Sequence, residues 1–340
     1  MAHAKTIAPN RSSNLELSPE MYVPQFAPGE VFRTETFNPD FDPRIYAAAA
    51  EAGKIVVSAA FKDFVTGAKG VEIFTDKQID GRRSAHGVRF GSMVGKADLG
   101  IRVALKPFSD PSDAVNELSG YERLLELSIP TFSPIGIFPA LHGDHFISVS
   151  AKNNNLQSLD RAPWVVGRAA DSEKSMMLAE ENDRQVKGIS DTLAYIHANG
   201  IFHPDGQVKN FAANASGRVG VIDTEGMVVR ELGDEDSSEL AWNDINKLVK
   251  SLVVEASRDD DEDKIFGVGM FARMPLNLVR AGINDLILEP YIDKLEKISK
   301  SAGGRQQRQI DLLSDGIIKH FYEDERWPQH FIDMNRRSFR

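Results

Sequence analysis

The sequence predicts an α+β fold with two lobes, a small β-rich N-lobe and a larger, mainly helical C-lobe. Strand-like runs gather before about residue 150, and helical periods of about 3.6 residues dominate after it. The length of 340 residues also fits two lobes, since domains usually hold roughly 100–200 residues. We therefore divide the chain into an N-terminal extension (1–43), an N-lobe (44–150) and a C-lobe (151–340).

The composition excludes several classes of protein. Hydrophobic residues make up 41% and charged residues 26%, which is typical of a globular chain. A formal net charge of −10 gives no general attraction to nucleic acid or to an anionic membrane, so we expect neither as a partner. The absence of cysteine excludes disulfides and thiolate sites and fits a reducing compartment. Without the apolar stretch of a signal peptide at its start, the protein is expected to be soluble and cytoplasmic.

The N-lobe is predicted to begin with a short helix at 46–52, followed by a series of strands. Runs of apolar and β-branched residues predict the strands, which are expected at 54–60, 71–75, 88–94, 135–138 and 146–149. A further strand at 101–106 shows strict alternation, with Ile101, Val103 and Leu105 on one face. This alternation places Lys106 at the end of a strand.

A helix is predicted to follow this strand. Asp110-Pro-Ser-Asp113 combines an N-cap residue, a proline at the first helical position and an acid three residues after the cap. The helix would end before Pro130 and carry Glu117 and Tyr121 on the same face.

The C-lobe begins after a polar crossing at 152–155. Val186, Ile189, Leu193 and Ile196 follow a helical period that stops at 199–200, an Asn-Gly pair. Two short strands are expected at 211–213 and 218–222. Acidic runs at 234–236 and 259–263 are interpreted as solvated loops, because consecutive acids cannot all face one ion.

The residues that carry chemistry lie between 196 and 226. Asp205, in His203-Pro-Asp205, precedes Asn210 by five residues. Asp223 comes 13 residues after Asn210, at the end of a hydrophobic strand. Carboxylate and amide oxygens suit a hard divalent cation such as Mg²⁺. With Lys106 upstream, the chain supplies a phosphate-binding cation, two metal ligands and a candidate base, the set that phosphoryl transfer needs.

These motifs resemble those of the protein-kinase-like superfamily. Val103-Ala-Leu-Lys106 is similar to the V-A-I-K strand, and His203-Pro-Asp205 with Asn210 resembles the H-x-D-x-x-x-x-N catalytic loop. Asp223-Thr-Glu resembles the D-F-G position, and Asp244 resembles the helical aspartate that ties down the catalytic loop. The resemblance covers roughly residues 88–254 and implies a bilobal protein-kinase-like fold with ATP and Mg²⁺ in the cleft between the lobes.

For the nucleotide, the resemblance implies that Lys106 contacts the α- and β-phosphates. A carboxylate of the following helix would hold this lysine, with Glu117 as our choice and Glu122 as its rival. No G-x-G-x-x-G motif precedes these residues. The nearest phosphate loop is 81–87, where Arg82, Arg83 and Ser84 would bind phosphate in place of backbone amides.

For the chemical step, the resemblance implies that Asp205 accepts the proton of the acceptor hydroxyl or orients it, while Asn210 and Asp223 hold Mg²⁺. His203 would be a packing residue. Gln207 stands where serine/threonine kinases usually carry lysine, and Lys209 is near enough to serve instead.

The interval from Asp223 to Asp244 is only 21 residues and contains no A-P-E motif. The chain therefore resembles the compact branch of the superfamily, such as aminoglycoside phosphotransferases and other small-molecule or atypical kinases. The expected acceptor is a hydroxyl or amine of a small molecule or of a flexible protein segment. The alternatives are a kinase-like protein that binds a nucleotide or partner without turnover, and transfer of AMP. The extension 1–43 would dock a protein partner or cover the cleft.

Overall fold

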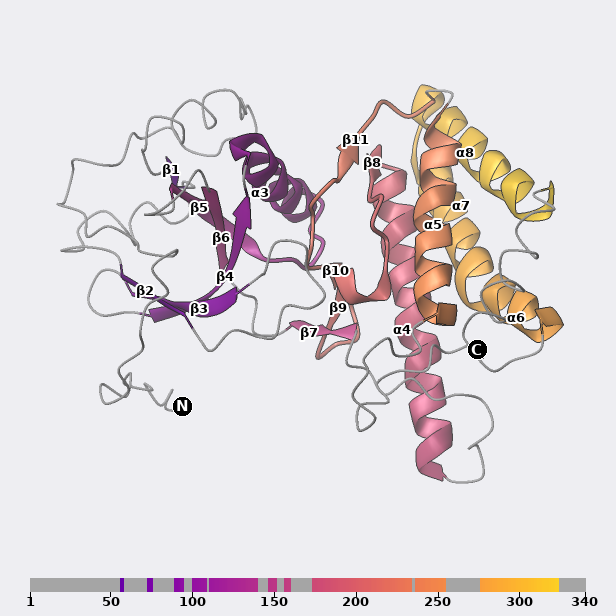
Figure 1. The fold of residues 1–340 in the computed structure, drawn as a ribbon. Helices are drawn as coiled ribbons and strands as arrows, with labels where there is room; N and C mark the ends of the chain where they lie inside the picture. The colour runs from indigo at the N-terminus through magenta and orange to yellow at the C-terminus, as the bar shows by residue number, and fades with distance from the viewer. Residues whose placement is uncertain are drawn as a thin grey trace, which may run out of the picture. The chain divides into compact units, whose positions relative to one another are not determined.

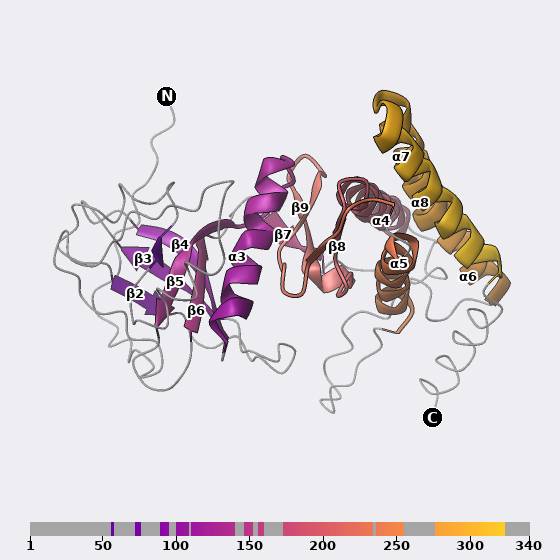
Figure 2. The same ribbon diagram turned by 90° about the horizontal axis from the view of Figure 1, so that it is seen from above.

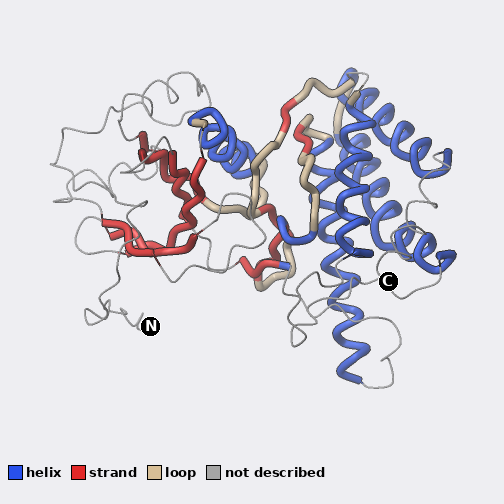
Figure 3. The backbone as a smooth tube through the Cα atoms, in the orientation of Figure 1, coloured by secondary structure: helices blue, strands red, loops and turns tan. Residues whose placement is uncertain are grey.

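The computed structural model describes residues 56–57, 72–75, 89–94, 100–108, 110–139, 146–151, 156–159, 173–233, 236–254 and 276–323. These residues form an α+β structure in which helices predominate (Figures 1 and 3). The chain divides into two compact units, Met1–Val115 with Pro134–Lys152, and Asn116–Ser133 with Asn153–Arg340. No helix within the described ranges is long and apolar enough to cross a membrane.

Several predicted features lie outside the described residues. They are the extension 1–43, the helix 46–52, the loop 81–87 with Arg82, Arg83 and Ser84, the crossing 152–155, and the acidic runs apart from Asp236.

The first unit is built on a six-stranded sheet in the order β1-β5-β6-β4-β3-β2. The strands are β1 (Val56–Val57), β2 (Glu72–Thr75), β3 (Arg89–Val94), β4 (Gly100–Phe108), β5 (Ser133–Pro139) and β6 (Phe146–Ala151). Each of them overlaps a strand that the sequence predicts. β4 lies between β3 and β6 and runs antiparallel to both. Its two faces are covered, because Val103 and Leu105 on one face and Ala104 and Lys106 on the other are all buried.

The predicted helix after β4 is α3 (Pro111–Glu126). Its start has the expected capping chemistry, since Asp110 Oδ1 accepts hydrogen bonds from the Ser112 amide at 2.8 Å and from the Ser112 hydroxyl at 2.6 Å. The helix ends before Pro130, as the sequence indicates.

The second unit contains five helices within the described ranges, which are α4 (Glu173–His197), α5 (Ser237–Val254), α6 (Leu276–Ile283), α7 (Glu289–Ser301) and α8 (Gly304–Glu323). A π-helical turn, Asn284–Leu288, joins α6 to α7. α7 packs on α4, and α8 packs on α5 and α7 (Figures 1 and 2). Side chains from all these contacts, among them Leu193, Ile245, Leu295 and Ile317, form one apolar core.

Short strands complete the second unit. β9 (Phe211–Asn214) and β10 (Val219–Val221) confirm the two predicted strands and form a sheet with β7 (Leu156–Ser158). β8 (Ile201–Phe202) pairs with β11 (Val228–Val229). Gly200 separates α4 from β8 with a φ of +72°, and a Cβ there would lie 2.2 Å from the Arg230 carbonyl oxygen. The helix stop predicted at 199–200 therefore needs glycine.

Candidate functional site

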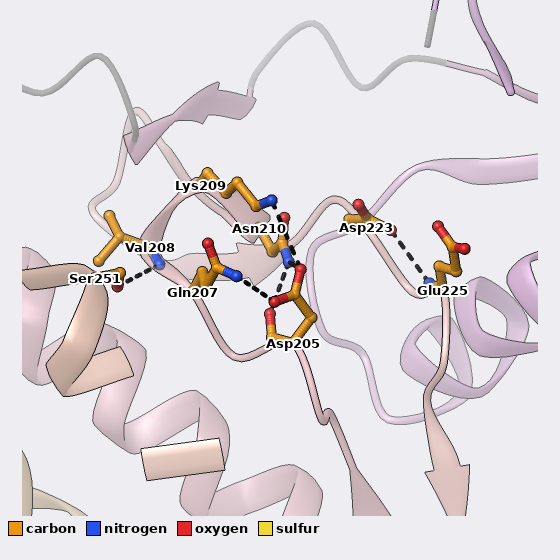
Figure 4. Close-up of polar contacts among 8 residues, drawn as sticks. All are labelled: Asp205, Gln207, Val208, Lys209, Asn210, Asp223, Glu225 and Ser251. Carbon is orange, nitrogen blue, oxygen red and sulfur yellow. Dashed lines mark hydrogen bonds and ion pairs between the residues drawn. The ribbon is translucent and has the colours of Figure 1, made fainter. Parts of the chain in front are cut away.

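The loop from His203 to Asn210 follows β8 and enters β9 through a 3₁₀ turn, Val208–Asn210. Its backbone is closed by two local hydrogen bonds, from the Gln207 amide to the Asp205 carbonyl at 2.7 Å and from the Asn210 amide to the Gln207 carbonyl at 2.9 Å. The Val208 amide donates to Ser251 Oγ of α5 at 3.0 Å (Figure 4). The loop therefore has a defined shape and is fastened to a core helix.

The Asp205 carboxylate is held by side chains of its own loop (Figure 4). Gln207 Nε2 donates to Oδ1 at 2.5 Å, and Asn210 Nδ2 donates to Oδ2 at 2.8 Å and to the Asp205 carbonyl at 2.7 Å. Lys209 Nζ lies 3.7 Å from Oδ2. The carboxylate nevertheless keeps 37% of its side-chain surface exposed to solvent.

Asp223 is brought next to Asn210 by the pairing of β9 with β10. The Ile222 amide donates to the Asn210 carbonyl at 2.9 Å, directly after the Val221↔Phe211 pair of the ladder. Asp223 Oδ1 accepts the Glu225 amide at 3.2 Å (Figure 4). The predicted metal ligands therefore lie on neighbouring ends of paired strands, with Asp205 on the other side of Asn210.

The donor chemistry of this pair suits Mg²⁺. The Asn210 amide nitrogen supplies both hydrogen bonds to Asp205, so neither of them uses its amide oxygen. Mg²⁺ takes one or two carboxylates and otherwise keeps water or phosphate oxygens, so one carboxylate and one amide oxygen are a fitting protein share. Among the described residues, no group of three or more His, Cys, Asp or Glu side chains could hold a metal ion.

α3 holds the residues on both sides of Asp223. Tyr121 donates from its hydroxyl to the Ile222 carbonyl at 2.9 Å, and Thr224 Oγ1 donates to the Glu117 carbonyl at 2.6 Å. Gly120 makes this approach possible, because a Cβ there would lie 2.6 Å from Thr224 Cβ. The backbone around Asp223 is thus fixed by one turn of α3.

Beneath the loop lies a fully buried aspartate, Asp244 of α5. Its Oδ2 accepts the His203 backbone amide at 2.5 Å and lies 3.0 Å from His197 Nε2. Asp244 is 1% exposed and the two histidines are completely buried. The resemblance implies this role for Asp244, and the carboxylate does bind the start of the loop.

The His203 ring is buried against Phe211, with a centroid distance of 6.2 Å. Within the described part of the chain, neither of its ring nitrogens has a hydrogen-bond partner. Burial lowers the pKa of His203, although Asp244, Asp223 and Asp205 raise it in part. A neutral ring with no polar partner fits the packing role that the resemblance implies.

The remaining predicted residues belong to different parts of the chain. Lys106 is 5% exposed on β4 of the first unit, with Nζ 5.4 Å from the Phe108 ring centroid. Glu117 belongs to the second unit, where Tyr121 Oη lies 2.9 Å from its Oε1 and its side chain is 3% exposed. Glu122 is only partly buried. Pairing of Lys106 with Glu117 and phosphate binding by Arg82, Arg83 and Ser84 remain predictions.

Three contributors to the site have roles that the sequence motifs do not predict. Gln207, which departs from the motif, holds Asp205; Thr224 ties the Asp223 segment to α3; and His197 joins Asp244. The partners of Thr224 and His197 lie 107 and 47 residues away, beyond the reach of local patterns. Neither a scan against models of protein families nor a search of curated proteins found a match to this chain.

Proposed function

We propose that this protein is an ATP- and Mg²⁺-dependent phosphotransferase with a bilobal kinase-like fold. The observation that carries the proposal is the arrangement of Asp205, Asn210 and Asp223. The Asn210 side chain binds the partly exposed Asp205 carboxylate, and the Asn210 backbone carbonyl accepts the amide of the residue before Asp223. Phosphoryl transfer depends mostly on positioning and on neutralising phosphate charge. Asp205 would position the acceptor, and a Mg²⁺ ion held by Asn210 and Asp223 would supply the positive charge.

In the proposed reaction the acceptor oxygen or nitrogen forms a bond to the γ-phosphorus of ATP, while the bond to the β–γ bridging oxygen breaks and ADP leaves. Asp205 orients the acceptor and takes its proton. Asn210 and Asp223 would hold Mg²⁺, which would supply positive charge against the phosphates. Lys106 binds the α- and β-phosphates, with Glu117 as the carboxylate proposed to hold it.

The short segment after Asp223 supports a small or flexible acceptor. β11 pairs with β8, and the Arg230 amide donates to the Gly200 carbonyl at 2.8 Å. Arg305 of α8 pairs with Glu231 at 2.5 Å, and Gln309 Nε2 donates to the Leu232 carbonyl. A segment fastened in this way supports neither a phosphorylation-controlled loop nor a platform for a folded protein substrate.

One observation favours the second candidate, a nucleotide-binding protein without turnover. Both oxygens of Asp205 already accept hydrogen bonds within the loop, as in a purely structural aspartate. Each carboxylate oxygen has two acceptor sites, however, so the remaining capacity still allows contact with an acceptor hydroxyl.

The test is thermal unfolding with ATP, with and without Mg²⁺. A ligand that binds only the folded state adds RT ln(1 + [L]/Kd), about 2.7 kcal/mol at a hundredfold excess over Kd. We expect Asp223→Ala to lose the Mg²⁺-dependent part, and Asp315→Asn, an exposed acid on α8, to retain it. No shift of the wild type at millimolar nucleotide would contradict the proposal. Formation of ADP, of pyrophosphate or of neither distinguishes phosphoryl transfer, AMP transfer and binding alone.

A further inference from the structure

A buried polar chain links α7 to the loop that carries Asp205. Tyr291 of α7 places its hydroxyl 2.8 Å from His197 Nδ1 at the end of α4. His197 Nε2 lies 3.0 Å from Asp244 Oδ2 of α5, and the same oxygen accepts the His203 backbone amide at 2.5 Å. Four elements therefore meet through three hydrogen bonds that are shielded from water.

The direction of these hydrogen bonds follows from the chemistry of the groups. Asp244 Oδ2 is an acceptor, so His197 Nε2 is the donor and carries a proton. In the tautomer that carries only this ring proton, Nδ1 is an acceptor and Tyr291 is the donor. Burial raises the pKa of Tyr291 well above its usual range, with the Asp244 carboxylate adding to the shift, so the hydroxyl keeps its proton at neutral pH.

Few other orientations of the His197 ring are compatible with its surroundings. It stacks on Phe202 at a centroid distance of 5.3 Å and meets the Tyr291 ring edge-on at 5.6 Å. Tyr291 and His197 are both 0% exposed, so water cannot replace the hydroxyl as a donor without reorganisation. Loss of the Tyr291 hydroxyl would leave His197 Nδ1 without a hydrogen-bond donor, or the ring proton would move from Nε2 to Nδ1. A proton on Nδ1 in place of Nε2 breaks the hydrogen bond to Asp244.

We propose that Tyr291 is a positioning residue for the proposed reaction, which fixes the His197 tautomer and through Asp244 sets the position of the loop carrying Asp205. The inference rests on the proposed function for its kinetic part only. Its structural part, the tautomer and the restraint on the His203 amide, is measurable without ATP.

The test compares Tyr291→Phe with Ser299→Ala. Both changes remove a single hydroxyl from the buried face of α7, but the Ser299 hydroxyl donates to Asp311 of α8 at 2.6 Å instead of to His197. Ser299→Ala therefore controls for the loss of a buried hydrogen bond and for general destabilisation of α7.

In the wild type, ¹⁵N NMR should show one protonated and one bare nitrogen on His197. In Tyr291→Phe we expect a changed tautomer or protonation state and about tenfold faster hydrogen exchange at the His203 amide. The reference is the Val221 amide, which donates to the Pro130 carbonyl at 3.0 Å. We expect kcat to fall about tenfold or more with KM for ATP unchanged, because misplacement by about 1 Å can cost about a hundredfold. Ser299→Ala should change none of these readouts.

Two structural results would overturn the inference, and one kinetic result would also do so. One is a wild-type His197 with both nitrogens protonated; the other is a Tyr291→Phe protein whose His197 signals and His203 exchange match those of Ser299→Ala. If both structural changes occur but kcat is unaltered in an active enzyme, the positioning role is also refuted. A wild type that neither binds nor uses Mg·ATP contradicts the proposed function instead, and the NMR readouts still decide the restraint by Tyr291.

Discussion

At the scale of single residues, Asp205 is the side chain on which the proposed chemistry depends. Asp205→Asn keeps the shape of the side chain and removes its charge. We expect kcat to fall by roughly 10²–10⁴-fold, the usual contribution of a positioned base, with little change in ATP affinity. Steady-state kinetics and nucleotide titration check this, with Asp315→Asn as the control. Unchanged turnover would remove Asp205 from the mechanism.

Because the His203 ring is buried, we expect the folding stability of the protein to depend on pH. Burial depresses the pKa of its folded form below that of the unfolded chain, so below about pH 6.5 the unfolded state binds the proton more readily. Stability is therefore full above that pH and falls on acidification by up to about 1.4 kcal/mol per pH unit. The titratable groups that face the ring are Asp244, Asp223, Asp205 and His197.

Urea unfolding of the wild type and His203→Leu between pH 5 and 8 measures this effect. We expect the wild type to lose stability more steeply than the variant as the pH falls below 6.5. Parallel stability profiles would show that the buried ring does not titrate as its surroundings imply.

At the scale of elements, hydrogen bonds join α3 to the residues on both sides of Asp223. Thr224→Val keeps the shape against Gly120 but removes the hydrogen bond to the Glu117 carbonyl, whereas Thr224→Ser keeps the hydroxyl. Both variants should lose about 1 kcal/mol of folding stability. Thr224→Val loses the hydrogen bond, and Thr224→Ser loses a buried methyl group. Only Thr224→Val should weaken the Mg²⁺-dependent thermal shift with ATP. Equal shifts in the two variants would mean that this hydrogen bond does not position Asp223.

At the scale of the whole molecule, the length of the segment between Asp223 and Asp244 predicts the class of acceptor. Its pairing with β8 and its contacts with α8 support a reaction on small molecules or flexible chains. In a ³²P-transfer screen, we expect label on pooled metabolites, aminoglycosides or unfolded peptides. Efficient labelling of one folded protein, with none of these acceptors labelled, would contradict this prediction.

Much of the fold and the order of the candidate residues follow from the sequence alone, because both depend on neighbours in the chain. Alternation predicts β4 with Lys106 at its end, although the strand continues two residues further to Phe108. The Asp110 cap predicts α3, and the Asn-Gly pair at 199–200 predicts the end of α4. These signals work because side-chain periodicity, capping and φ preferences act within a few residues. The spacing of Asp205, Asn210 and Asp223 is likewise a property of the chain itself.

Only the tertiary structure decided what surrounds these residues. Thr224 meets Glu117 across 107 positions, and His197 meets Asp244 across 47 and Tyr291 across 94. Such pairings arise when packed helices exclude water and every buried polar group must find a partner inside the protein. No local sequence pattern encodes these long-range partners. The restraints on Asp205 and Asp223 therefore depend on the tertiary packing of α3, α4, α5 and α7.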